Sequence, residues 1–243
     1  RYIPGNPTVI MEHMPGAGGV IAGNHLYGPG PQDGTKILLS HSIPLAEKLG
    51  RIFTGLAGGA PEGLTVEVRG EIAGTDVKVL ELAALKGVFA GVVEEQVSYV
   101  NAPVLAEQRG VEVTLTTDRT SEDHRSLLRV TLTQTDGSTV SVAGTVTGAK
   151  DVAKVVEVDN FDVDVPVSDH MAFFRYHDRP GVVGIVGRAL GEADVNIGGM
   201  QVSRDDSGHA LIVLTVDSAI PSDRLDSIVA EIGAHSGKAV SLR

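Results

Sequence analysis

The stretch "FFRYHDRPGVVGIVGRALGEADVNI", residues 173–197, decides how the last third of the chain folds. It reads as an apolar strand, a polar loop, a helix with one apolar face and the start of a second strand. The pattern continues with a turn, a strand, a helix that opens at Pro221 and ends at Gly237, and a last strand. Residues 168–243 are therefore predicted to form a ferredoxin-like βαββαβ domain.

The glycines of this stretch raise the question of a nucleotide site. A dinucleotide-binding turn places G-x-G-x-x-G directly after a strand, so that the backbone can approach a pyrophosphate. Here the polar residues 176–180 separate the strand from the first glycine, and the other glycines lie inside the helix. Asp205 follows the second strand, as a ribose-binding acid would, but residues 206–243 are too few for a doubly wound sheet. The sequence therefore argues against a nucleotide site.

The same glycines recur at spacings of three and four along the helix. Glycine at this spacing lets a helix pack close to a sheet, so we expect that role for them. The residues that the helix is expected to bury are Val182, Val183, Val186 and Leu190.

The loop before this helix has the chemistry to bind a free amino acid. Pro180 lies in the first turn, where its missing N–H costs nothing. The N–H groups of residues 181–183 carry the positive end of the helix dipole and suit a carboxylate. Asp178 suits an ammonium group, and a cap on the helix is the alternative role for it.

The middle of the chain, residues 60–166, is predicted to be an α+β domain with a mostly antiparallel sheet. Thr75 is positioned to cap an apolar helix that follows the first strand. Two hairpins are indicated, one turning at residues 135–138 and one at Asp159-Asn160.

Composition excludes several classes of function. The chain has 31 Asp and Glu against 20 Lys and Arg, a net charge of −11, which disfavours nucleic acid and anionic membranes as partners. It has no cysteine, so a disulfide framework, a thiol nucleophile and a cysteine-held metal cluster are excluded. We see no apolar run long enough to span a membrane and no signal peptide. Because the chain starts at Arg1 without a methionine, we expect the natural N-terminus to lie upstream.

Motifs for catalysis are not found. HExxH, G-x-S-x-G and P-loop patterns are missing, so we assign no catalytic residue, no cofactor-binding residue and no metal ligand. In the middle domain, three basic residues are candidates for an anion site, with a solvated surface role as the alternative for each. They are His124, Arg125 and Lys154.

Residues 1–43 are rich in glycine and proline. Their "PTVIMEHMPGAGGVIAGNHLY" and "QDGTKI" resemble part of the solute-binding proteins of tripartite tricarboxylate transporters. That resemblance implies that the turn Pro15–Gly19 lines a carboxylate pocket, while a strand–turn–helix without a ligand is the alternative. A natural fusion and a mis-joined fragment are both left open. A helix over 44–59, which stops at a Gly-Gly pair, follows as a linker.

The run "YHDRPGVVGIVGRALGEADVNIGGM" resembles an ACT domain, the amino-acid-sensing module. The resemblance implies that Tyr176, Asp178 and the loop Arg179–Val183 hold the effector. It also implies that Asn196 reaches the ligand from a paired domain, because these modules usually bind at a side-by-side dimer interface. Alternatives remain: Asn196 as an edge-strand hydrogen bonder, and Tyr176 and His177 as plain surface residues.

Residues 44–243 as a whole resemble the C-terminal half of the long-form D-3-phosphoglycerate dehydrogenase family. The helix "PLAEKLGRIFTGLAGG", the intervening domain and the ACT domain follow in the family's order. The resemblance implies an α+β fold and a cytoplasmic homo-oligomer that senses L-serine. It also implies that NAD and the catalytic residues belong to a portion missing from this chain. One departure concerns the intervening domain, because "VDNFDVDVPV" is acidic where the family is proposed to hold an anion.

Two other functions stand beside this one. A periplasmic carboxylate-binding protein would rest on residues 1–43 and would require tricarboxylate affinity. A subunit of an iron–sulfur L-serine dehydratase combines similar domains, but it would need cluster cysteines on a partner chain.

Overall fold

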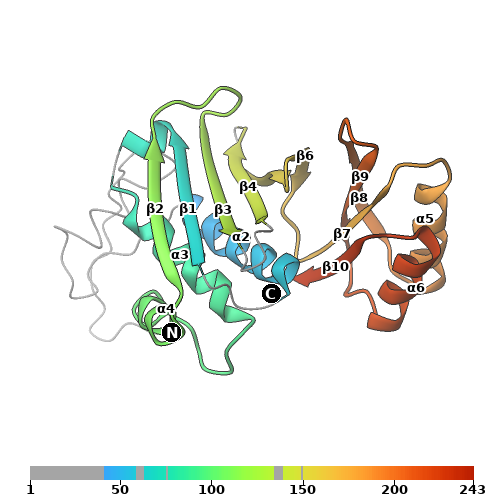
Figure 1. Ribbon diagram of the computed structural model, residues 1–243, viewed down its shortest axis with the longest axis horizontal. Helices are drawn as coiled ribbons and strands as arrows, with labels where there is room; N and C mark the ends of the chain where they lie inside the picture. The colour runs from blue at the N-terminus through green and yellow to red at the C-terminus, as the bar shows by residue number, and fades with distance from the viewer. Residues whose placement is uncertain (1–40, 59–62, 75, 134–138, 149) are drawn as a thin grey trace, which may run out of the picture.

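The computed structural model describes residues 41–58, 63–74, 76–133, 139–148 and 150–243. These residues form two units, each built on its own sheet, that lie side by side (Figure 1). Three predicted features lie outside the described residues: the solute-binding-like segment except for its last three residues, the Thr75 cap, and the hairpin turn at 135–138.

The first unit is an α+β domain with a six-stranded sheet in the order β2-β1-β3-β4-β5-β6. Only the β1–β2 pair is parallel, so the predicted, mostly antiparallel sheet is confirmed. Its helices are α2 (Ser42–Ala57), α3 (Lys78–Ala90), α4 (Ala102–Gln108) and the 3-10 turn η2 (Glu71–Gly74). Its strands are β1 (Gly63–Gly70), β2 (Glu112–Asp118), β3 (Ser126–Thr133), β4 (Thr139–Thr147), β5 (Val152–Val158) and β6 (Phe161–Pro166).

Two features of this unit follow directly from local sequence. The β5–β6 hairpin turns at Asp159 and Asn160 with φ of 48° and 67°, the left-handed pair that this turn type requires. At the start of α3 the Asp76 carboxylate accepts a hydrogen bond of 3.0 Å from the Lys78 N–H. The second predicted hairpin is confirmed, and an aspartate next to the predicted position satisfies a free N–H at the helix start.

The helix α2 ends at Gly58, which has a φ of 81°, as its Gly-Gly pair predicts. We expected α2 as a linker, and in space it is packed into the core against α3 and β4. The two helices approach very closely at glycines. A Cβ on Gly50 would lie 2.2 Å from the Ala84 carbonyl oxygen, and a Cβ on Gly87 would lie 1.9 Å from that of Glu47.

The second unit has the predicted βαββαβ order, with its sheet in the order β10-β7-β9-β8. Its elements are β7 (His170–His177), α5 (Val182–Glu192), β8 (Ile197–Arg204), β9 (His209–Val216), α6 (Ser222–Ile232) and β10 (Ser236–Ser241). The fold class predicted for the whole chain, α+β with a ferredoxin-like second domain, is confirmed.

The predicted end of α6 is wrong. The helix ends at Ile232 and is capped by Gly233 with a φ of 62°, whereas Gly237 lies inside β10. A Cβ on Gly237 would lie 2.2 Å from a Val229 methyl group and 3.1 Å from the Phe174 ring. Gly237 is therefore the residue that lets α6 pack close to the sheet.

The close-packing role expected for the α5 glycines is also wrong. A Cβ added to Gly184, Gly187 or Gly191 would meet no atom within 4 Å. The predicted burial of Val183 is wrong as well. Val182 and Val186 are buried against the sheet, whereas Val183 is 45% exposed. The glycine face of α5 therefore lies on the outside of the described chain.

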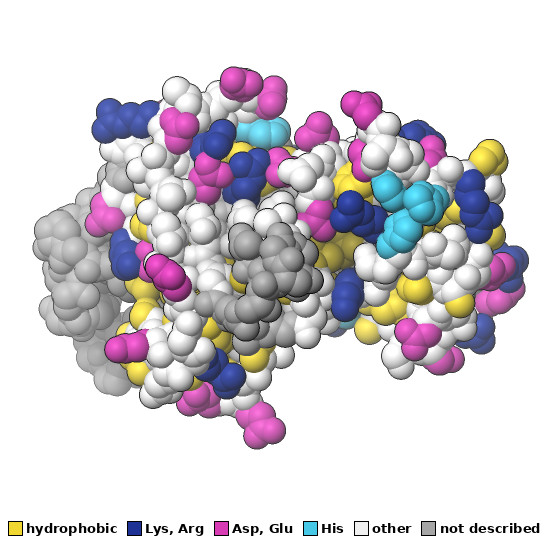
Figure 2. All heavy atoms as spheres, viewed as in Figure 1, with side chains coloured by type: hydrophobic (Ala, Val, Ile, Leu, Met, Phe, Trp, Pro, Cys, Tyr) yellow, Lys and Arg dark blue, Asp and Glu magenta, His cyan; other side chains and the backbone are white. Residues whose placement is uncertain are grey.

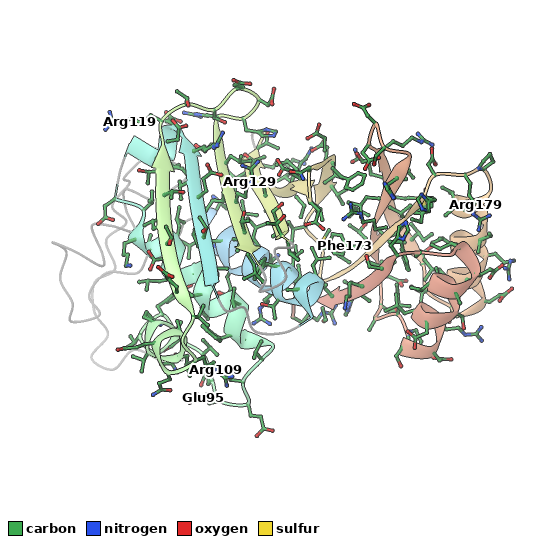
Figure 3. All side chains as sticks on the ribbon, viewed as in Figure 1. Glu95, Arg109, Arg119, Arg129, Phe173 and Arg179 are labelled. Atoms are coloured by element: carbon green, nitrogen blue, oxygen red, sulfur yellow. The ribbon has the colours of Figure 1, made fainter. Side chains whose placement is uncertain are left out.

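The second sheet is covered on both faces. Helices α5 and α6 cover one face, and the other packs on the first unit around Phe173, which lies between the two units (Figure 3). Leu211 and Val213 of β9 join this shared core. At its border the Asp164 N–H donates to the Gln201 side chain at 2.7 Å. Among the described residues, no helix is both long and apolar enough to cross a membrane.

Candidate functional site

The loop between β7 and α5 presents the helix N-terminus without a cap. Gly181 precedes the helix with a φ of 92°, a conformation that favours glycine, and no side chain caps α5. The first N–H groups of a helix have no partner within the helix, so those of Val182 and Val183 point toward the loop. The arrangement suits a carboxylate.

Asp178 does not cap this helix. Its carboxylate accepts a hydrogen bond of 2.7 Å from Arg204 Nε, and its backbone N–H donates to the Gly208 carbonyl at 2.9 Å. The loop is therefore tied to the β8–β9 turn, and the capping alternative is excluded. An ionised carboxylate offers about four acceptor positions, so one guanidinium leaves room for an ammonium group.

Tyr176 is a buried core residue rather than a surface residue. Its side chain is 1% exposed and packs between α5 and the sheet. Burial raises the pKa of its phenol, and the Asp178 carboxylate raises it further. Tyr176 therefore belongs to the core beneath the second sheet's helices, two residues before Asp178 in the chain.

The other loop residues, apart from Val182, lie at the surface. Arg179 extends along α6, where its Nη2 donates to the Glu231 carbonyl at 3.3 Å, and it is labelled at the edge of the second unit in Figure 3. Pro180 and Gly181 are exposed, and Val182 is buried under the first turn of α5. The site therefore offers backbone N–H groups and one carboxylate toward solvent.

Asn196 lies immediately before β8, an edge strand of the second sheet. Its backbone N–H donates to the Asp217 carboxylate at 3.0 Å, and its carbonyl accepts from the Asp217 N–H at 3.1 Å. These contacts fix the backbone, while the residue itself is exposed. The edge-strand role therefore belongs to the backbone of Asn196, and its side-chain amide is available to a ligand or a partner.

The three basic candidates of the first unit lie toward one end of its sheet. Arg125 directly precedes β3, and Lys154 lies on β5, so β4 separates them. Thr145 of β4 contacts both sides: it pairs with Lys154, and its hydroxyl donates to the Ser126 carbonyl at 2.6 Å. His124 directly precedes Arg125 in the loop.

Two of these candidates already have acidic partners. Arg125 forms a bidentate pair with Glu71, and Lys154 lies 2.8 Å from the Asp164 carboxylate. An anion would have to compete with both carboxylates for these cations.

Sequence reasoning missed a histidine cluster on the second unit. His177, His209 and His235 each offer a ring nitrogen, and these nitrogens lie within 4.8 Å of one another. The three positions are far apart in the sequence and match no spaced motif. The one available signal was the strand pairing, because β7 and β9 place His177 directly opposite His209.

Two family models match the chain, one in each of its two units. Residues 38–159 match the D-3-phosphoglycerate dehydrogenase intervening domain, and residues 170–233 match the ACT domain. The D-3-phosphoglycerate dehydrogenase of Mycobacterium leprae (strain TN) is 41% identical over 201 residues, 82% of this chain and 38% of that protein. That of Synechocystis sp. (strain ATCC 27184 / PCC 6803 / Kazusa) is 35% identical over 202 residues, 82% of this chain and 36% of that protein. The chain thus spans less than two fifths of these relatives.

Proposed function

Because the chain belongs to the D-3-phosphoglycerate dehydrogenase family, through its intervening and ACT domains, we propose that it is the L-serine-sensing segment of such an enzyme. One observation carries the proposal: the uncapped N-terminus of α5 and the Asp178 carboxylate border the same short loop. An amino acid offers the complementary pair of charges, a carboxylate and an ammonium group.

Each half of the ligand has a partner in this arrangement. The carboxylate accepts hydrogen bonds from the N–H groups of Val182 and Val183, where the helix dipole adds favourable charge. The ammonium group donates to Asp178, which shares its carboxylate between the ligand and Arg204. The Asn196 amide of a second copy completes the site from the β8 edge. A small polar side chain such as that of serine fits a loop lined by backbone and a single carboxylate.

Self-association through the second unit is part of the proposal. The edge strand β8 carries unpaired backbone groups, which a second β8 can satisfy. On α5, the outward glycines each cost helix stability and have no packing role within the described chain. We propose that these glycines allow a second copy to pack closely along α5.

Replacing Gly184 with leucine tests this interface. Since nothing lies within 4 Å of a Cβ there, the monomer stays folded, but the bulk obstructs a partner at α5. We expect self-association at least about tenfold weaker, equivalent to about 1.4 kcal/mol, by sedimentation equilibrium. Ala230→Leu, on the exposed side of α6, is the control and leaves association unchanged. Equal self-association in Gly184→Leu and the parent chain would place the interface elsewhere.

The dehydrogenase chemistry itself belongs, in this proposal, to the part of the enzyme outside this chain. Oxidation of 3-phosphoglycerate with NAD would take place there, in the cytoplasm, and serine bound to the ACT unit would lower its rate through coupling between sites. The chain alone would then have no NAD-dependent turnover.

Thermal unfolding with and without L-serine tests the ligand. A ligand at a hundredfold excess over its dissociation constant stabilises the bound state by about 2.7 kcal/mol, so serine should raise Tm. We expect Asn196→Ala to lose this shift, and Gln108→Ala, an exposed amide on α4, to keep it. A shift that persists in Asn196→Ala would remove that residue from the site, and no shift at any serine concentration would contradict serine binding.

A further inference from the structure

Three histidines meet on one face of the second unit, where Figure 2 shows their side chains gathered. His177 ends β7 and His209 begins β9, and because the two are paired across the ladder their side chains lie on the same face. His235 joins them from the turn between α6 and β10. Its backbone N–H donates to the Arg175 carbonyl at 2.7 Å, which fixes its position.

The rings are in mutual contact. The ring centroid of His177 lies 4.5 Å from the ring centroids of both His209 and His235. The His177 ring is stacked on that of His209 and edge-on to that of His235. The His209 and His235 rings are 5.2 Å apart. Their nearest ring nitrogens converge within 4.8 Å.

The ring of His209 is oriented from behind. Its Nδ1 lies 2.8 Å from the Ser207 hydroxyl and 3.6 Å from the Asp205 carboxylate. Asp205 is itself held in the turn, because it accepts hydrogen bonds from the N–H groups of Ser207 and His209. With Nδ1 engaged in this way, Nε2 of His209 is the nitrogen left for a ligand, as in the outer-shell arrangement of metal-binding histidines.

From this geometry we propose that His177, His209 and His235 bind a divalent transition-metal ion, with zinc as the best match. Neutral imidazole is a good ligand for Zn²⁺, and three histidines with a water in the fourth position are a known zinc coordination. The site goes beyond serine binding and does not depend on it.

Charged neighbours of the cluster act on a bound cation in opposite directions. Arg175, whose carbonyl accepts from the His235 N–H, opposes a bound cation, whereas the Asp205 carboxylate, behind His209, favours it.

The cluster needs a modest contraction to bind. Tetrahedral bonds of about 2.0–2.1 Å place ligand nitrogens about 3.3 Å apart, closer than the present limit of 4.8 Å. His177 and His235 are exposed, so rotation about their side-chain bonds can close this gap without moving the strands.

Calorimetric titration of the purified full chain with ZnCl₂, after removal of metal with EDTA, tests the site. We expect one zinc per chain, with affinity at least about a hundredfold weaker in His177→Ala and in His235→Ala. Ser207→Ala removes only the support of His209 and should weaken binding by about tenfold. His170→Ala, at the other end of β7, serves as the matched control and should bind like the parent chain.

An NMR measurement on the parent chain makes the test independent of variant folding. Imidazole nitrogen resonances of all three histidines should shift together at one equivalent of zinc. The proposal is overturned if zinc binds equally well to the two cluster variants, or if the three resonances do not move. L-Serine binding in the presence of EDTA is measured separately, so failure of either site leaves the other result readable.

Discussion

Replacing Asp178 with asparagine should remove most of the affinity for L-serine. The substitution keeps the shape of the side chain but deletes the charge that we propose faces the ammonium group of the ligand. A hydrogen bond to a charged group contributes about 1.5–3 kcal/mol, so we expect the dissociation constant to rise by roughly tenfold to a hundredfold or more. Titration calorimetry measures this directly.

Arg204 provides the matched comparison, because it is the present partner of the same carboxylate. Arg204→Met removes the competing guanidinium and leaves Asp178 free for the ligand, so serine affinity should hold or rise. Both side chains of the pair are partly exposed, and such a pair contributes only about 0–1 kcal/mol to folding. Parallel losses of serine affinity in Asp178→Asn and Arg204→Met would mean that the pair shapes the loop and that Asp178 does not contact the ligand.

The largest expected effect on stability belongs to Gly87→Ala. The new methyl group would lie 1.9 Å from the Glu47 carbonyl oxygen, and a backbone atom cannot rotate away as a side chain can. Overpacking should cost about 3 kcal/mol against a gain of about 1 kcal/mol from replacing a helical glycine. The net loss of about 2 kcal/mol corresponds to a Tm lower by about 4–8 °C.

The same substitution at Gly191 is the control. There the Cβ meets nothing within 4 Å, so only the gain in helix stability of up to about 1 kcal/mol remains. Chemical denaturation of the two variants should therefore shift in opposite directions. A Gly87→Ala protein as stable as the parent chain would show that α2 and α3 are farther apart than the structure has them.

Local signals in the sequence were sufficient for much of the fold. The left-handed turn at Asp159-Asn160, the glycine end of α2 and the alternating strands each follow from a few neighbouring residues. These features carried the fold class and the order of elements. The loop chemistry alone indicated Asp178 and residues 181–183 as candidate site residues. The resemblance to an ACT domain added Tyr176 and Asn196, because neither helix spacing nor composition selects Asn196.

What the sequence could not supply depends on tertiary placement. A glycine that admits a close neighbour and one that faces outward look the same in sequence. Close packing was therefore predicted for Gly184, whereas the structure shows it at Gly237. Likewise, a pattern of apolar spacing did not show that Val183 lies outside the buried face of α5. The histidine cluster needed both the β7–β9 register and the turn after α6, which bring three distant residues together.

We propose above all that this chain binds L-serine through its ACT unit. Titration calorimetry of the purified chain with L-serine, with glycine and citrate as comparators, tests it most directly. We expect saturable heat with serine, no comparable heat with citrate, and loss of the serine signal in Asp178→Asn. Heat with citrate and none with serine would contradict it and would instead favour the carboxylate-binding function expected from residues 1–43.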